Sequence, residues 1–170
     1  MIPTEPNNLK QWQVPAARQI GRLFTCGRPG RATFGRAWIS IDNHTIDLWV
    51  SGLPASEVMH IVSLLGRKKG KDCLSEFCYY PFRSSKEPGT KPTFQEWLNE
   101  HYGSRFVIHE FPTVDATGIP TDVLKAITCC IRRLLEDGGT VVVVDSAGAE
   151  RTARVCEAIG AKRMIQKGAM

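Results

Sequence analysis

A run of β-branched residues at 140–144 constrains the fold most. Its sequence, Thr-Val-Val-Val-Val, has no polar alternation, which is typical of a strand buried in a sheet with helices on both faces. Asp145 ends the run, a turn containing Gly148 follows, and residues 150–160 have the spacing of a helix. Amides at the start of a helix point outward unpaired, and the helix dipole adds partial positive charge. A strand, turn and helix in this order therefore predicts a phosphate-binding loop.

The segments before this loop predict an α/β fold. Apolar residues recur every three or four positions over 121–136, which is helical spacing. Thr93 is a suitable cap for a short helix over 94–101, and residues 105–109 predict a further strand. The order strand, helix, strand, loop, helix favours a central, mainly parallel sheet flanked by helices. The loop then lies at the carboxyl end of strand 140–144, where such sheets bind ligands.

The first part of the chain carries weaker signals. Residues 46–50 alternate apolar with less apolar positions and predict a strand, and 55–60 resemble the start of a helix. Residues 61–65 could continue that helix or form a strand, and the pattern leaves both open. Residues 1–37 mix Pro, Gly and Arg with few periodic apolar positions, so we expect an irregular N-terminal arm. Residues 38–170 then form a single domain.

The composition favours a globular protein of the cytoplasm. Hydrophobic residues make up 42% and charged residues 23%, and no apolar run approaches the length of a membrane span. The N-terminus lacks the charged and apolar regions of a signal peptide. The six cysteines show no Cys-x-x-Cys pair and no metal-ligand spacing with the four histidines. We therefore expect free thiols in a reducing cytoplasm, and no metal.

The charge favours an anionic partner. The formal net charge is +5, and a phosphorylated protein, a lipid headgroup or a nucleic acid would each be compatible with it. The densest basic cluster, residues 66–71, lies between glycines without interleaved aromatic residues. It is either a solvated loop or a rim that steers phosphate, and the sequence does not decide between them.

Two motifs resemble the protein tyrosine and dual-specificity phosphatases. That family carries His-Cys, five further residues and then Arg followed by Ser or Thr, often as HCSAGxxRT. In this chain Val144 stands at the family's His position and Asp145 at its nucleophilic Cys. A second match, 111–115 followed by Ile119-Pro120, is similar to the family's general-acid loop. The resemblance covers roughly residues 40–165, and the residues that fall on the first pattern are Ser146, Ala147, Gly148, Arg151 and Thr152.

The resemblance implies a role for each matched residue. In the family a thiolate at the position of Asp145 attacks phosphorus, and the guanidinium at Arg151 holds phosphate oxygens. Asp115 would protonate the leaving oxygen, and Thr152 would hydrogen-bond residue 145 and ease its departure. The substrate would be a phosphorylated protein or another phosphomonoester, with no cofactor. The loop amides that surround the phosphate would be those of Ser146, Ala147, Gly148, Ala149, Glu150 and Arg151.

Asp145 sets the chemistry apart from that of the family. A carboxylate is a weaker nucleophile than a thiolate and presents negative charge to a phosphate dianion. At about 4 Å and an effective dielectric near 20 that repulsion is on the order of 8 kcal/mol before neighbouring cations offset it. We therefore expect a catalytically inactive phosphatase-like protein, either a natural pseudophosphatase or an inactivated variant of an active enzyme. The carboxylate could also fold into the loop and accept hydrogen bonds from its amides and from Arg151.

Other functions remain open from the sequence. Aspartyl-phosphate chemistry with Mg²⁺ uses Asp-x-Asp-x-Thr, and here Ala147 replaces the second Asp. The chain could instead be a non-enzymatic module that binds a phosphorylated ligand or serves as a scaffold. The third interpretation is a structural α/β domain that has no role in binding phosphate. The sequence is therefore compatible with all three functions, and with a phosphotyrosine, phosphoserine, phosphoinositide or RNA phosphate substrate.

Overall fold

The computed structural model describes residues 5–15, 21–31, 42–80, 92–114 and 118–165. Strands, α-helices and short 3₁₀ helices, labelled η, alternate along these segments. In chain order they are β1 (Lys10–Gln13), β2 (Arg22–Gly27), α2 (Asn43–Gly52), β3 (Met59–Lys69), β4 (Asp72–Ser75), η1 (Glu76–Tyr79), α3 (Phe94–Tyr102), η2 (Gly103–Arg105), β5 (Phe106–Thr113), α4 (Thr121–Glu136), β6 (Thr140–Asp145), α5 (Glu150–Ile159) and β7 (Lys162–Arg163).

One sheet organises the fold, and it is mixed. Its strand order is β4-β3-β6-β2-β1-β7, with β5 also paired to β3. The pairs β2–β6, β3–β6 and β3–β5 are parallel, while β1–β2, β1–β7 and β3–β4 are antiparallel. The prediction of an α/β fold is confirmed, but the prediction of a mainly parallel sheet is wrong. The antiparallel strands come from a tight hairpin at Gly70 and from short strands near both ends of the chain, none of which has a strong sequence pattern.

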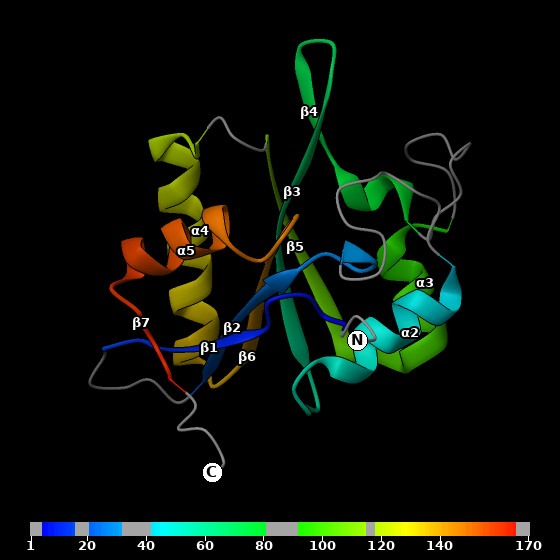
Figure 1. Ribbon diagram of the computed structural model, residues 1–170, viewed down its shortest axis with the longest axis horizontal. Coiled ribbons are helices and arrows are strands. Elements are labelled where there is room, and N and C mark those ends of the chain that lie inside the picture. The colour runs from blue at the N-terminus through cyan, green and yellow to red at the C-terminus, as the bar shows by residue number, and fades with distance from the viewer. Residues whose placement is uncertain (1–4, 16–20, 32–41, 81–91, 115–117, 166–170) are drawn as a thin grey trace.

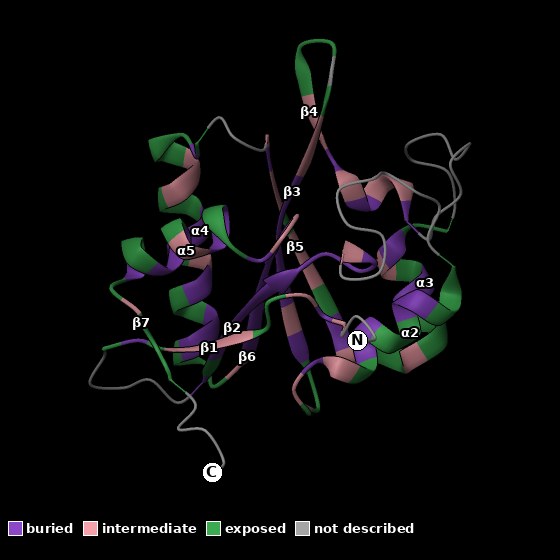
Figure 2. Cartoon of the chain, in the orientation of Figure 1, coloured by how far each residue is buried: buried purple, intermediate pink, exposed green. Residues whose placement is uncertain are grey.

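The valine run forms the predicted central strand. All six residues of β6 are buried (Figure 2), and β6 lies between β2 and β3. Val141 and Val143 pack into the core on one face of the sheet, whereas Val142 and Val144 pack into the core on the other. A strand covered on both faces has no place for polar side chains, which is why its sequence does not alternate.

Helices cover both faces of the sheet. Figure 1 shows α4 and α5 on one side and α2, α3 and η1 on the other. The predicted helix over 121–136 is confirmed as α4, and the predicted helix after the turn is confirmed as α5, which ends at Gly160 in the left-handed conformation. The helix predicted over 94–101 is confirmed as α3. Its cap is Thr93, in a reciprocal capping box with Glu96.

The strand predicted over 46–50 is wrong, because these residues belong to α2. Asp42 accepts a hydrogen bond from Thr45 N at 2.8 Å and so caps the helix. Ile46, Trp49 and Val50 are buried at helical spacing, whereas Leu48 is 45% exposed. A stretch of five mainly apolar residues is compatible with the periodicity of a strand and with that of a helix. The N-terminal cap at Asp42 favours the helix.

The helix start predicted at 55–60 is also wrong. β3 begins at Met59, and its residues 61–65 are all fully buried. The strand alternative for 61–65 is therefore the correct one. Parallel partners lie on both sides of this segment, β5 and β6, and their backbone groups satisfy those of β3.

The N-terminal arm predicted over 1–37 is not irregular throughout, because it supplies β1 and β2. β2 pairs with the full length of β6, from Arg22 opposite Thr140 to Gly27 opposite Asp145. Residues 28–31 form a turn, closed by Arg31 N donating to Arg28 O at 3.2 Å. β2 belongs to the core because it pairs with the central strand β6. The pattern of six residues alone does not predict such long-range pairing.

The predicted state of the cysteines is confirmed. All six are free thiols; Cys129 and Cys130 are neighbours on α4, and the other four lie on separate elements of the fold. Within the described segments, no helix combines the length and the apolar character that crossing a membrane requires.

Two histidines predict a pH dependence of stability. His60 Nδ1 and His109 Nε2 lie 3.1 Å apart, and burial lowers the pKa of both rings, with the positive charges of His60 and Arg133 lowering the pKa of His109 further. A lowered folded-state pKa means that the unfolded chain binds more protons, so this contribution to stability is present above the ordinary histidine pKa of about 6.5 and is lost as the pH falls through the lowered folded-state pKa. The melting temperature should fall over this range, and less steeply in His60→Gln/His109→Gln.

His44→Gln is the control for that experiment, because His44 is exposed on α2. Parallel pH profiles for the double variant and the parent chain would contradict the interpretation of the histidine pair.

Candidate functional site

The candidate site is the turn between β6 and α5. It begins at Asp145, where β6 ends beside Gly27 of β2, and it reaches the first turn of α5 at Glu150. Ala147 forms an isolated bridge with Gly27, so the turn is fastened to the carboxyl end of β2 as well as to β6. The turn therefore lies at the edge of the sheet where the parallel strands end, as the sequence predicts.

The carboxylate of Asp145 lies inside this turn. Its Oδ1 accepts hydrogen bonds from Ala147 N at 3.0 Å and from Gly148 N, and its Oδ2 accepts one from Thr152 N at 3.0 Å. Asp145 is only 2% exposed. Three backbone N–H groups thus converge on one oxyanion, and that oxyanion belongs to the chain itself. The expectation that this carboxylate accepts hydrogen bonds from the loop amides is confirmed, whereas the expected hydrogen bond from Arg151 stays a prediction.

The turn requires glycine at position 148. Gly148 has φ +67°, a conformation that L side chains rarely adopt. A Cβ at this position would also clash with the backbone of Cys26 and Gly27, because the turn packs directly on the end of β2. The glycine that identified the loop in the sequence therefore permits both the conformation and the close approach.

Arg151 binds the sheet rather than serving only the turn. Its side chain is buried, and Nη1 donates to Leu64 O at 2.9 Å, to Thr113 O at 2.6 Å and to Thr113 Oγ1 at 3.3 Å. The pairing of β3 with β5 shifts register just here, between Ser63 and Leu65. The guanidinium thus supplies a donor to carbonyl oxygens at an irregular point of the sheet, and it ties α5 to β3 and β5.

The remaining residues of the predicted loop differ from one another in burial and in their contacts. Thr152 is buried and reaches Asp145 through its backbone N–H, whereas Ala149 and Glu150 are exposed at the start of α5. Ser146 is half-buried, and its Oγ accepts a hydrogen bond from Arg31 Nη1 at 3.3 Å. The structure therefore brings Asp145 and Thr152 together and leaves the side chains of Ala149 and Glu150 at the surface.

The predicted acid loop begins later than the motif suggests. Its first residues, Phe111 to Thr113, form the end of β5. Asp115 lies outside the described residues, so its role stays a prediction. Thr113 contacts Arg151, and this contact joins the end of the second motif to the first turn of α5.

Two residues that the sequence does not predict as part of the site, Asn7 and Asn8, hydrogen-bond the outer side of the turn. Asn7 Nδ2 and Asn8 Nδ2 both donate to Ala147 O, at 3.0 and 2.9 Å, and Gly27 N donates to Asn7 O at 2.7 Å. Nothing in a polar segment before a short strand indicates contacts with residues so distant in the chain. These contacts limit how far the turn can open.

Two thiols near the site have raised pKa values. Burial, with the charge of Asp145 adding to it, raises the pKa of Cys26 well above its ordinary value. Burial also raises the pKa of Cys73, although the positive charge of Arg151 opposes the shift. Because only a thiolate is a strong nucleophile, a raised pKa disfavours both thiols as nucleophiles.

The described residues hold no group of three or more His, Cys, Asp or Glu side chains that could bind a metal ion.

Comparison with family models, with curated proteins and with solved structures finds no match to this chain. The interpretation of the site therefore depends on its own residues and geometry.

The contacts of Arg151 predict a large effect on stability. The variant Arg151→Met lacks the charged donor that two buried carbonyl oxygens use, so its unfolding free energy should be about 1–3 kcal/mol lower than that of the parent chain. Urea unfolding followed by circular dichroism measures the change. Arg154→Met is the matched control, because Arg154 is exposed on the same helix. Equal unfolding free energies for the two variants would show that Arg151 does not tie α5 to the sheet.

Proposed function

We propose that this chain is a phosphatase-like protein that does not hydrolyse phosphomonoesters, because its oxyanion-binding turn is filled by its own aspartate. The observation that carries the proposal is the set of three N–H groups, from Ala147, Gly148 and Thr152, that bind the Asp145 carboxylate. Groups that converge on one oxyanion in this way suit phosphate oxygens equally well. The residue pattern around them is the one that resembles the phosphatases.

The same geometry disfavours hydrolysis by Asp145 itself. Both of its oxygens accept hydrogen bonds, which lowers the reactivity of their lone pairs and fixes the side chain away from an incoming phosphorus atom. An incoming phosphate dianion would also meet the negative charge of the carboxylate. Val144, at the family's His position, is fully buried in the hydrophobic core, so that position offers no polar group to the turn.

A second role, as a non-enzymatic module for an anionic partner, is favoured by the β3–β4 hairpin. β3 pairs with β6 only as far as Ser63, so its remaining residues extend beyond the carboxyl edge where the turn lies. Lys68 and Lys71 near the tip of this hairpin are exposed. A phosphorylated protein is the partner class that we propose for this basic hairpin, and nucleic acid is the competing anion. Six free thiols support a cytoplasmic location.

Restoring the missing groups tests the proposal. The parent chain should not hydrolyse p-nitrophenyl phosphate. Asp145→Cys, alone or with Val144→His, should gain activity, because a helix N-terminus lowers the pKa of a thiol at this position. Adding Arg151→Ala should abolish that activity, and adding Asp115→Asn should remove the dependence of the rate on a protonated acid. Hydrolysis by the parent chain would refute the proposal, and no activity in any folded variant would leave only the binding or structural roles.

Binding of inorganic phosphate gives a second test. Asp145→Ala frees three N–H groups and removes a negative charge, so phosphate should raise its melting temperature while leaving that of the parent chain unchanged. Asp122→Ala is the control, because Asp122 is exposed on α4. Equal stabilisation of the parent chain and of Asp145→Ala would show that the aspartate does not block the turn.

A further inference from the structure

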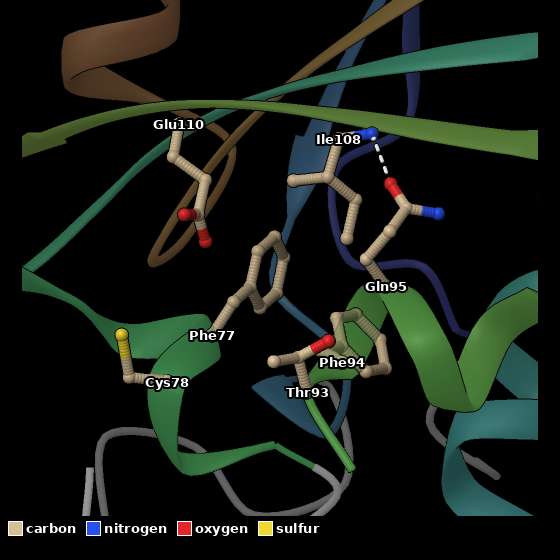
Figure 3. Close-up of a pocket in the computed structure, with 7 residues that line it drawn as sticks. All are labelled: Phe77, Cys78, Thr93, Phe94, Gln95, Ile108 and Glu110. Carbon is tan, nitrogen blue, oxygen red and sulfur yellow. Dashed lines mark hydrogen bonds between the residues drawn. The ribbon is translucent and has the colours of Figure 1, made fainter. Parts of the chain in front are cut away.

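A small pocket, which Asp145 does not line, lies on the α2–α3 side of the sheet. It has a volume of about 240 Å³ and opens between η1, the start of α3 and the edge of β5. Small-molecule sites have volumes of roughly 300 Å³ or more, so this pocket is sized for a single side chain. Figure 3 shows the carboxylate of Glu110 directed toward the ring of Phe77, with Phe94 beyond it.

The pocket is built to receive positive charge. Glu110 is the charged residue in its lining, and Ser75 Oγ holds the carboxylate by donating to Oε1 at 2.8 Å. The side chains of Phe77 and Phe94, with ring centroids 4.8 Å apart, also line the pocket, and because both are almost completely buried they give it an apolar floor against which the aliphatic part of a long cationic side chain can pack. The positive end of the α3 dipole lies nearby, but the carboxylate of Glu96 in the capping box offsets it.

The edge of β5 next to the pocket has the pattern of a strand that accepts a partner. Among the described strands, β5 pairs with β3 alone. On its other edge the Gln95 carboxamide donates to Phe106 O and accepts from Ile108 N, both at 2.8 Å. A neighbouring strand would make this same pair of hydrogen bonds with one of its peptide groups.

Strand alternation then directs the next backbone groups toward the pocket. Because Phe106 O and Ile108 N face away from β3, Ile108 O and Glu110 N face the same way, one step further along the strand. These groups lie beside the pocket that Ile108 and Glu110 themselves line. An extended peptide paired here would continue the row that Gln95 begins, with one side chain entering the pocket.

We propose that this edge binds an extended peptide segment of a partner protein, and that the pocket receives an arginine or lysine side chain of that segment. The cationic head pairs with Glu110 and the aliphatic part of the side chain lies against Phe77, while the peptide backbone hydrogen-bonds the edge of β5. The site is independent of the turn at Asp145, and it stands whether or not that turn binds phosphate.

The test uses a short peptide, acetyl-Thr-Val-Arg-Val-Thr-amide, and its citrulline analogue, which keeps the shape but lacks the charge. Binding to the full chain is followed by NMR through the backbone amide signals of Ile108 and Glu110. The arginine peptide should bind about tenfold tighter than the citrulline peptide, as expected for a hydrogen bond to a charged group. This difference should vanish in Glu110→Gln and persist in Glu136→Gln, a control on the exposed end of α4.

Three results would overturn the proposal. Equal affinity of the two peptides for the parent chain would show that the pocket does not select charge. An unchanged preference in Glu110→Gln would assign the selection to another residue. Binding of free propylguanidine as tight as that of the peptide would show that the strand edge contributes nothing.

Discussion

The contact between the Asp145 carboxylate and three backbone N–H groups organises the end of the sheet. The turn brings together N–H groups that a helix start leaves unpaired, and a buried donor without a partner is costly. Asp145 supplies that partner from within the turn. The turn is therefore satisfied without any external ligand, and its shape does not depend on one.

Arg151 extends this arrangement to the other strands. Burying a guanidinium is costly unless it makes hydrogen bonds, and two carbonyl oxygens at the irregular β3–β5 pairing accept hydrogen bonds from Nη1. The same residue type that would clamp a phosphate thus contributes to the fold. A ligand that recruited this guanidinium would have to compete with Leu64 and Thr113, and this competition adds to the effect of the filled turn.

Segments with a strong local signal were predictable from the sequence. The uninterrupted valine run of β6 and the three-and-four spacing of α4 each allow one structure, and Thr93 marks the start of α3 through its own cap. The pattern at 46–50 fits a strand or a helix, and only the cap at Asp42 separates them. β2 is a strand because β6 lies beside it, and the contacts of Asn7 with the turn arise only after folding. Long-range pairing decides such elements, and local propensity does not contain it.

The fastening of the turn by Asn7 and Asn8 bears on how the motif can be used. These hydrogen bonds join residues 140 and 139 positions apart in the sequence, and β2 adds a second contact from the N-terminal half. Closing such distant contacts requires both halves of the chain to have folded together. A fragment that carries only β6, the turn and α5 would hold every residue of the recognisable motif and still lack its outer wall. The motif therefore cannot be moved to another protein by itself. A protein that received it would have to supply other donors in place of the amino-terminal residues that hold the turn.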